Sequence, residues 1–153
     1  MLRFNHMEIT VPPGFVAQEG ENLLRFFEEI FGFERGAFPG LEDPHLVVST
    51  DPEGSQFLFL AENEVSLPAA SEDHLGFHVD SADEVEQIMQ RCERFAKEDS
   101  RVEIRDFGIL DLDQTSTRAF YVRYLLPLWF DVQNIAAKPG FEFAREWRFV
   151  SVR

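Results

Sequence analysis

Hydrophobic and polar residues alternate along the start of the chain, from Leu2 to Val11, which predicts a β-strand ended by Pro12-Pro13-Gly14. From about Gly20 to Phe33 the hydrophobic spacing becomes helical, and Gly32 suits the C-terminal cap of that helix. Three short extended stretches follow, at roughly Phe33–Phe38, His45–Thr50 and Gln56–Ala61. The predicted order is therefore strand, helix, strand, strand, strand.

The same order of elements then repeats. Alternation over Asp73–Asp80 predicts a strand, and Ser81-Ala82-Asp83-Glu84 is a capping box at the start of a second amphipathic helix that ends near Asp99. Further strands are expected at Val102–Phe107, Thr117–Tyr124 and Leu128–Gln133. The chain thus contains two βαβββ modules, and the corresponding histidines His6 and His74 are 68 residues apart.

The repeat divides the chain into parts. We expect one domain over residues 1–153, with module one at about 2–62, a polar linker at 63–72, module two at about 73–134 and a C-terminal extension at 135–153. Within the extension, Arg145–Arg153 alternates and could add an edge strand. In the first strand of each module the histidine face is opposite the apolar face, so the apolar faces should lie under the helices and the histidine faces should line a cavity.

Composition excludes several classes of protein. The 153 residues carry a net charge of −14, which disfavours binding to a nucleic-acid backbone or to an anionic membrane surface. A single cysteine excludes a scaffold held by internal disulfides, and no apolar run reaches the length of a spanning helix. We therefore expect a cytoplasmic protein. The 17 phenylalanines exceed the needs of a small core and suggest a lined pocket or an apolar homodimer interface.

Two βαβββ modules, each with a histidine early in its first strand, resemble the vicinal oxygen chelate superfamily (glyoxalase, bleomycin-resistance and extradiol dioxygenase proteins). Three segments carry the resemblance: Glu21–Phe33 (ENLLRFFEEIFGF), His74–Val79 (HLGFHV) and Arg123–Gln133 (RYLLPLWFDVQ). The last segment departs from the family pattern, because Tyr124–Pro127 replaces an Asp-Pro-Asp-Gly turn and Asp131 replaces a Glu. The resemblance implies an α+β fold in which two βαβββ modules form curved mixed sheets around a cavity, with the helices outside.

The resemblance also implies a metal site. His6, His74 and Asp131 match three of the family's four ligand positions, and two imidazoles with one carboxylate suit a divalent ion such as Fe, Mn, Ni or Zn. The fourth position falls at Phe59, which cannot bind a metal, as in the three-ligand members of the family. The shorter reach of Asp131 argues against the site, so a metal-free protein stays open as the alternative.

Other polar residues are candidates for catalysis or substrate contact. His78 is about 13 Å along the strand from His74, too far to share an ion, and is interpreted as a substrate contact or an acid/base. Glu8 shares the face of His6 and could orient a ligand or hold a substrate cation. Tyr121 and Arg123 are further cavity candidates whose strand face the sequence does not fix. Cys92 lies in the apolar stripe of the second helix and is expected to be a small buried hydrophobe.

Two functions remain. The first is a metal-dependent lyase, dioxygenase or transferase that acts on a small organic substrate, with the ion stabilising negative charge on neighbouring oxygens. The second is a metal-free, bleomycin-resistance-like protein that binds a small molecule or drug, for which the acidic surface would favour a cationic ligand. Both are expected to form a homodimer, because in this family a partner chain can complete the cavity.

Overall fold

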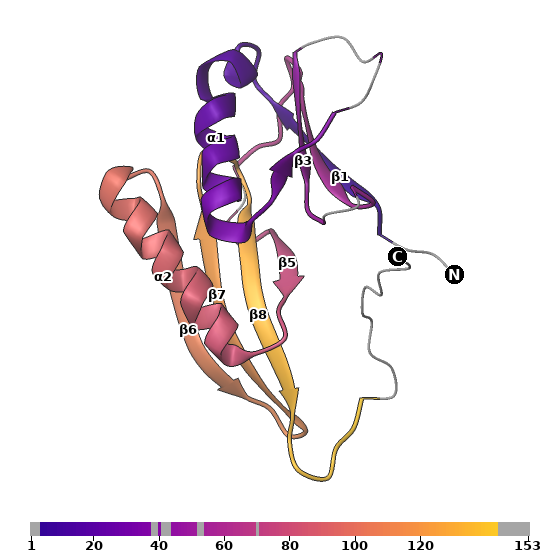
Figure 1. Ribbon diagram of the computed structural model, residues 1–153, viewed down its shortest axis with the longest axis vertical. Helices are drawn as coiled ribbons and strands as arrows, with labels where there is room; N and C mark the ends of the chain where they lie inside the picture. Colours follow the sequence, from indigo (N-terminus) through magenta and orange to yellow (C-terminus); the bar gives the residue numbers. More distant parts are fainter. Residues whose placement is uncertain (1–3, 38–39, 41–43, 52–53, 70, 144–153) are drawn as a thin grey trace.

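The computed structural model describes residues 4–37, 40, 44–51, 54–69 and 71–143. It contains two four-stranded mixed sheets and two helices, in the order of two βαβββ modules, which confirms the predicted α+β class (Figure 1). The expected edge strand at Arg145–Arg153 lies outside the described residues. Within the described part of the chain, no helix is long and apolar enough to cross a membrane.

Module one forms the first sheet, with strand order β1-β4-β3-β2. Its elements are β1 (His6–Val11), α1 (Phe15–Phe31), β2 (Glu34–Arg35), β3 (His45–Ser49) and β4 (Phe57–Glu62). β1 pairs with β4 in parallel, and the other pairs are antiparallel. Among the described residues β2 is shorter than predicted, because its ladder with β3 contains only two residue pairs.

Module two forms the second sheet, with strand order β5-β8-β7-β6. Its elements are β5 (His74–His78), α2 (Ala82–Glu98), β6 (Glu103–Asp111), β7 (Thr115–Arg123) and β8 (Trp129–Ala137). β6 and β8 both run four residues beyond their predicted ends, because each continues its pairing with β7. The first residues of the expected extension at 135–153 therefore belong to β8.

The start of α1 differs from the sequence prediction. The helix begins at Phe15, five residues before Gly20, and its N-cap residue Gly14 is left-handed (φ 83°) and supplies no side-chain cap. The cap comes from β4 instead: the Glu62 carboxylate accepts hydrogen bonds from Gly14 N at 2.7 Å and from Val16 N at 2.8 Å. This carboxylate satisfies donors that have no partner inside the helix and complements the positive end of its dipole.

The other predicted helix ends are confirmed. Gly32 caps α1 in a left-handed conformation (φ 71°), and its N–H donates to Glu28 O. Ser81 caps α2 by accepting from Glu84 N at 3.2 Å, while the Glu84 carboxylate reaches Asp80 N, one residue beyond the position predicted by the capping box.

Both sheets contribute to one hydrophobic core, which lies on their helix-covered sides. Aromatic contacts join the modules: Phe27 lies 5.4 Å from Phe130, and Phe26 lies 4.9 Å from Tyr124, between ring centroids. Ile9 of β1 and Val132 of β8 are fully buried in this core, which confirms the predicted apolar faces. The opposite faces of the two sheets, called here the open faces, carry the predicted polar candidates.

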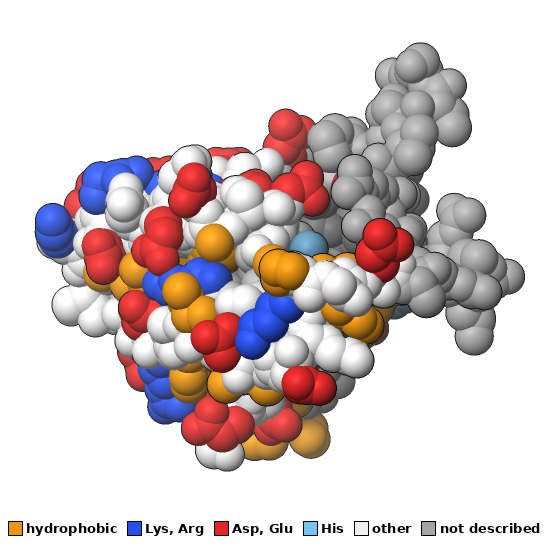
Figure 2. Space-filling view, turned by 90° about the horizontal axis from the view of Figure 1, so that it is seen from below, with side chains coloured by type: hydrophobic (Ala, Val, Ile, Leu, Met, Phe, Trp, Pro, Cys, Tyr) orange, Lys and Arg blue, Asp and Glu red, His pale blue; other side chains and the backbone are white. Residues whose placement is uncertain are grey.

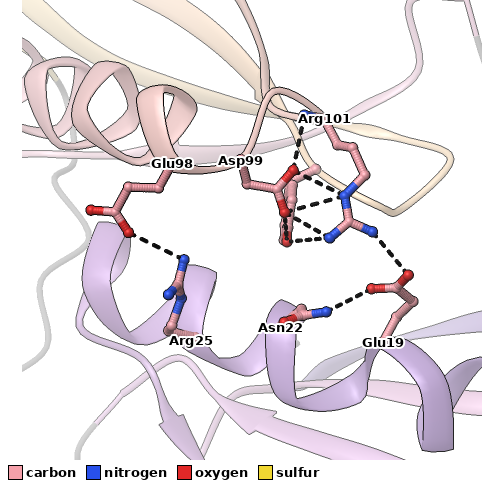
Figure 3. Close-up of polar contacts among 7 residues, drawn as sticks. Glu19, Asn22, Arg25, Glu98, Asp99 and Arg101 are labelled. Atoms are coloured by element: carbon pink, nitrogen blue, oxygen red, sulfur yellow. Dashed lines mark hydrogen bonds and ion pairs between the residues drawn. The ribbon is translucent and has the colours of Figure 1, made fainter.

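A polar cluster links α1 with the end of α2 (Figure 3). Arg101, just after α2, donates to Asp99 at 2.6 Å and to Glu19 of α1 at 2.9 Å. Arg25 of α1 pairs with Glu98 at the end of α2. Helix contacts and aromatic packing thus hold the modules together through their covered sides.

Candidate functional site

The open face of the second sheet carries a pocket of about 310 Å³. Its lining comes from β6, β7 and β8: Phe107, Gly108, Ile109, Leu110, Thr117, Ala119, Tyr121, Asp131 and Gln133. Asp131 and Gln133 share one face of β8, while Phe130 and Val132 are buried on the other, as the alternation of the sequence predicted. The structure also fixes the orientation of Tyr121, which the sequence left open.

Asp131 is the buried acid of this pocket. Its side chain is 8% exposed, and its Oδ1 has no hydrogen-bond partner within the described part of the chain. Burial raises the pKa of the Asp131 carboxyl above its usual range, and the charge of His74 opposes part of that rise. A buried carboxylate oxygen without a partner is costly, so this atom is suited to bind a proton, a cation or a ligand donor.

His74 is oriented towards this carboxylate. Its Nδ1 lies 2.9 Å from Glu72 O, and because a carbonyl only accepts, Nδ1 must donate. Nε2 then carries the lone pair of the neutral ring, and it lies 3.9 Å from Asp131 Oδ2. Gly76, the residue paired with Asp131 across β5 and β8, has no side chain to fill the space beside the acid.

Tyr121 completes this corner of the pocket. Its ring lies 4.8 Å from that of His74 and 4.7 Å from that of Phe107, between centroids. Burial, followed by the charges of Asp131 and Glu72, raises the pKa of the Tyr121 phenol. The phenol is therefore protonated at neutral pH and can donate a hydrogen bond or a proton.

The remaining sequence candidates lie elsewhere. His6 and Glu8 are exposed on the open face of the first sheet, where the His6 ring stacks on Phe57 at 4.9 Å and its Nδ1 lies 2.8 Å from Asn5 Oδ1. His78 is exposed at the end of β5, and its Nε2 accepts from Ile135 N at 3.3 Å. Across the residues that the structure describes, no three His, Cys, Asp or Glu side chains are grouped closely enough to hold a metal ion. A single chain therefore brings His74 and Asp131 together, whereas His6 lies on the other sheet.

Trp129 and two arginines border the site: Arg123 was a candidate from the sequence, but Arg105 and the contacts of both arginines with Trp129 were not foreseen. The buried indole ring lies beneath the guanidinium groups of Arg105 (4.2 Å) and Arg123 (4.4 Å), and its Nε1 donates to Ser71 O. Both arginines also form ion pairs, with Glu72 and Glu103 respectively. Strand alternation places Trp129 and Asp131 on one face, but the arginine contacts depend on pairing across three strands.

These features define a class of fold. Two βαβββ modules with four-stranded mixed sheets and helices on one side form a glyoxalase-like fold. The predicted fold is thereby confirmed.

Comparison with solved structures supports this fold. A glyoxalase family protein from Bacillus anthracis superposes with a TM-score of 0.62 at 17% identity, over 88% of this chain and 95% of that one. The FosX fosfomycin resistance protein from Listeria monocytogenes gives a TM-score of 0.56 at 12% identity, over 88% of this chain and 93% of that one. The FosX protein from Mesorhizobium loti gives a TM-score of 0.54 at 13% identity, over 88% of this chain and 92% of that one. No family model matches the sequence, and no curated protein matches it.

Proposed function

We propose that the protein is a divalent-metal-dependent enzyme that acts on a small organic substrate, with His74 and Asp131 as ligands of the ion. The observation that carries this proposal is the buried Asp131 carboxylate, whose Oδ1 has no partner and whose Oδ2 lies 3.9 Å from His74 Nε2. One ion about 2.0–2.2 Å from each atom can span that separation. A bound ion would also compensate the desolvation that opposes ionisation of Asp131.

The chain's own residues define what the site does around the ion. The hydrogen bond from His74 Nδ1 to Glu72 O fixes the ring and its tautomer, as partners of metal-bound histidines commonly do. The Tyr121 phenol lies beside these groups as a proton donor. When bound, the ion would polarise substrate oxygens and stabilise negative charge that develops on them.

We further propose that the site is completed in a homodimer. His74 and Asp131 leave ligand positions open, and His6 lies on a different open face of the same chain. A second copy can bring its His6 to the pocket if the open faces of the two sheets meet across a two-fold axis. Glu8 would then approach the same cavity, where it could position the substrate. We assign this homodimer to the cytoplasm, in line with its single buried cysteine.

A metal titration tests the ligand assignment. Protein purified without chelator should bind one Mn, Fe, Ni or Zn ion per chain, and Asp131→Ala or His74→Ala should abolish stoichiometric binding without unfolding the protein. Asp113→Ala, which removes an exposed acid in the β6–β7 turn, serves as the control. A wild-type protein that binds none of these ions would contradict the proposal and favour the metal-free binding protein.

Subunit mixing tests the contribution of the second copy. His6→Ala and Asp131→Ala should each lose metal binding alone. Equal mixing of the two variants should restore about a quarter of the sites, because half of the dimers would be mixed and each would have one intact site. Sedimentation as a 17.7 kDa monomer at micromolar concentration, or no recovery on mixing, would overturn the shared site.

A further inference from the structure

One wall of the pocket is built by four consecutive residues, from Phe107 to Leu110. In a regular strand, successive side chains point to opposite faces, so Phe107 and Leu110, three residues apart, would lie on opposite sides of the sheet. Here the register of β6 against β7 shifts between Asp106 and Gly108, and Gly108 has a left-handed backbone (φ 65°). This β-bulge changes the alternation, so that both Phe107, whose ring contacts Tyr121, and Leu110, which pairs with Thr117 of the pocket, lie on the open face. Ile109 pairs with Arg118 and falls on the covered side.

Arg118 holds the bulge from the covered side of the sheet. Its side chain is 7% exposed, and Nη1 donates to Asp106 Oδ1 at 2.6 Å and to Gly108 O at 3.3 Å. Nε donates to Glu86 Oε1 of α2 at 2.6 Å, and Asp106 Oδ1 also accepts from Gly108 N. The wall is therefore fixed before any ligand binds, and it is a preformed surface.

The large side chains of this wall are accessible. Phe107 and Leu110 are 53% and 57% exposed. Seen from the end of the molecule where β6 and β7 turn, hydrophobic side chains lie on the surface among Asp and Glu side chains (Figure 2). Exposed apolar groups that border a concave site are a common feature of ligand-binding surfaces.

The charge of the pocket limits what can lie on this wall. Asp131 is the one charged residue among the nine that line it. The nearest arginines on this face, Arg105 and Arg123, are already paired with Glu72 and Glu103 and lie on Trp129. An anionic substrate group would therefore have to break an existing ion pair to gain either arginine as a partner.

Building on the proposed metal site, we infer that the substrate carries an apolar, ring-sized body that lies on Phe107 and Leu110, with its oxygen atoms directed towards Asp131 and His74. The pocket volume of about 310 Å³ suits such a small molecule. A compact phosphonate such as fosfomycin has no body to cover this wall. The two ends of the pocket thus have different roles: one binds oxygen atoms, and the other selects the hydrocarbon part.

Two diols with the same vicinal oxygens test the inference. 1-Phenyl-1,2-ethanediol and 1,2-propanediol differ in carrying a phenyl or a methyl group, and fosfomycin provides the anionic comparison. Binding to the full-length protein, with and without added metal, can be followed by two-dimensional NMR of the amides of β6 to β8. We expect the phenyl compound to bind about tenfold more tightly than propanediol or more, because its ring removes apolar surface from water.

Two leucine variants test whether the preference for the phenyl compound depends on the wall itself. Leu110→Asp should reduce the preference for the phenyl compound to less than about twofold, since a charge at the wall disfavours a hydrocarbon contact. Leu112→Asp is the matched control, because Leu112 is similarly exposed (50%) but does not line the pocket. Phe107→Ala provides a second test of the wall without adding charge.

The outcomes distinguish this inference from the proposed function. Equal binding of the two diols, tighter binding of fosfomycin, or an equal effect of both leucine variants would overturn the apolar wall, even if a metal binds. A preference for the phenyl compound in a protein that binds no metal would support the wall and overturn the metalloenzyme.

Discussion

Nε2 of His74 and Oδ2 of Asp131 lie 3.9 Å apart across the parallel pair β5 and β8, in a corner that also contains Tyr121. Because His74 Nδ1 donates to Glu72 O, the ring in its neutral form presents Nε2 as an acceptor to a carboxylate that is itself an acceptor, whereas the protonated ring supplies the charge that favours ionisation of Asp131. Two facing acceptors repel unless a proton or a cation joins them. The stability of the metal-free protein should therefore depend on pH through the ionisation of Asp131.

In metal-free protein, Asp131→Asn should raise the free energy of unfolding at pH 7 by about 1 kcal/mol. The substitution removes a buried carboxylate charge whose Oδ1 has no partner among the described residues, and the cost of burying such a group is of this order. Burial raises the pKa of Asp131 in the folded state, so the folded wild type holds this proton more tightly than the unfolded chain. Its stability therefore falls as the pH rises from the unfolded value of about 3.8 through the raised pKa. Urea unfolding between pH 4 and 8, with chelator present, measures the difference.

The exposed Asp113→Asn is the control for charge alone. If Asp131→Asn were destabilising at pH 7, the ionised carboxylate would have a favourable partner in the folded protein, and the argument that Asp131 binds a ligand would fail.

Tyr124→Phe should reduce the free energy of unfolding by about 1–2 kcal/mol, because the phenol donates a 2.7 Å hydrogen bond to Asp99 Oδ2. Burial and this hydrogen bond raise the pKa of Tyr124 to about 12. The neutral phenol is favoured by folding, so its contribution is complete below the unfolded pKa near 10 and is lost as the pH approaches 12.

Absorbance titration near 295 nm can follow both tyrosines of the chain, and Tyr121→Phe isolates the signal of Tyr124. Ionisation of Tyr124 at pH 10 in folded protein would contradict both its burial and its hydrogen bond to Asp99.

Cys92 should be inert to thiol reagents in folded protein and fully reactive in urea. It is buried in the core, and burial raises the pKa of its thiol to about 12, so almost no thiolate forms at neutral pH. Reaction with Ellman's reagent at pH 8, with and without 8 M urea, measures this difference. Rapid reaction of the folded protein at a rate independent of urea would contradict the buried position.

Arg118→Met should destabilise the protein by about 1–3 kcal/mol, because the carbonyls of Gly108 and Ala119 lose a buried donor. Hydrogen exchange should increase at Gly108 N, whose acceptor Asp106 is no longer held in place. The exposed Arg94→Met, on α2, is the control. Unchanged exchange at the bulge would mean that the pairing of β6 with β7 alone maintains it.

The sequence by itself determined the local elements and their faces. Period-two alternation in β1, β5 and β8 placed His6, His74 and Asp131 on the faces opposite the core, because side chains in a strand alternate without tertiary help. The caps at Gly32 and Ser81 were equally predictable, since each depends on residues within one turn of its helix.

The tertiary structure decided what depends on residues distant in sequence. α1 starts early because Glu62, 46 residues beyond Val16, caps it from another strand. The orientation of Tyr121, the bulge at Gly108 and the unpartnered Asp131 oxygen follow from strand register and burial. The separation of His6 from His74 has the same origin: the shared core joins the covered faces of the two modules, so their open faces remain different surfaces of one chain.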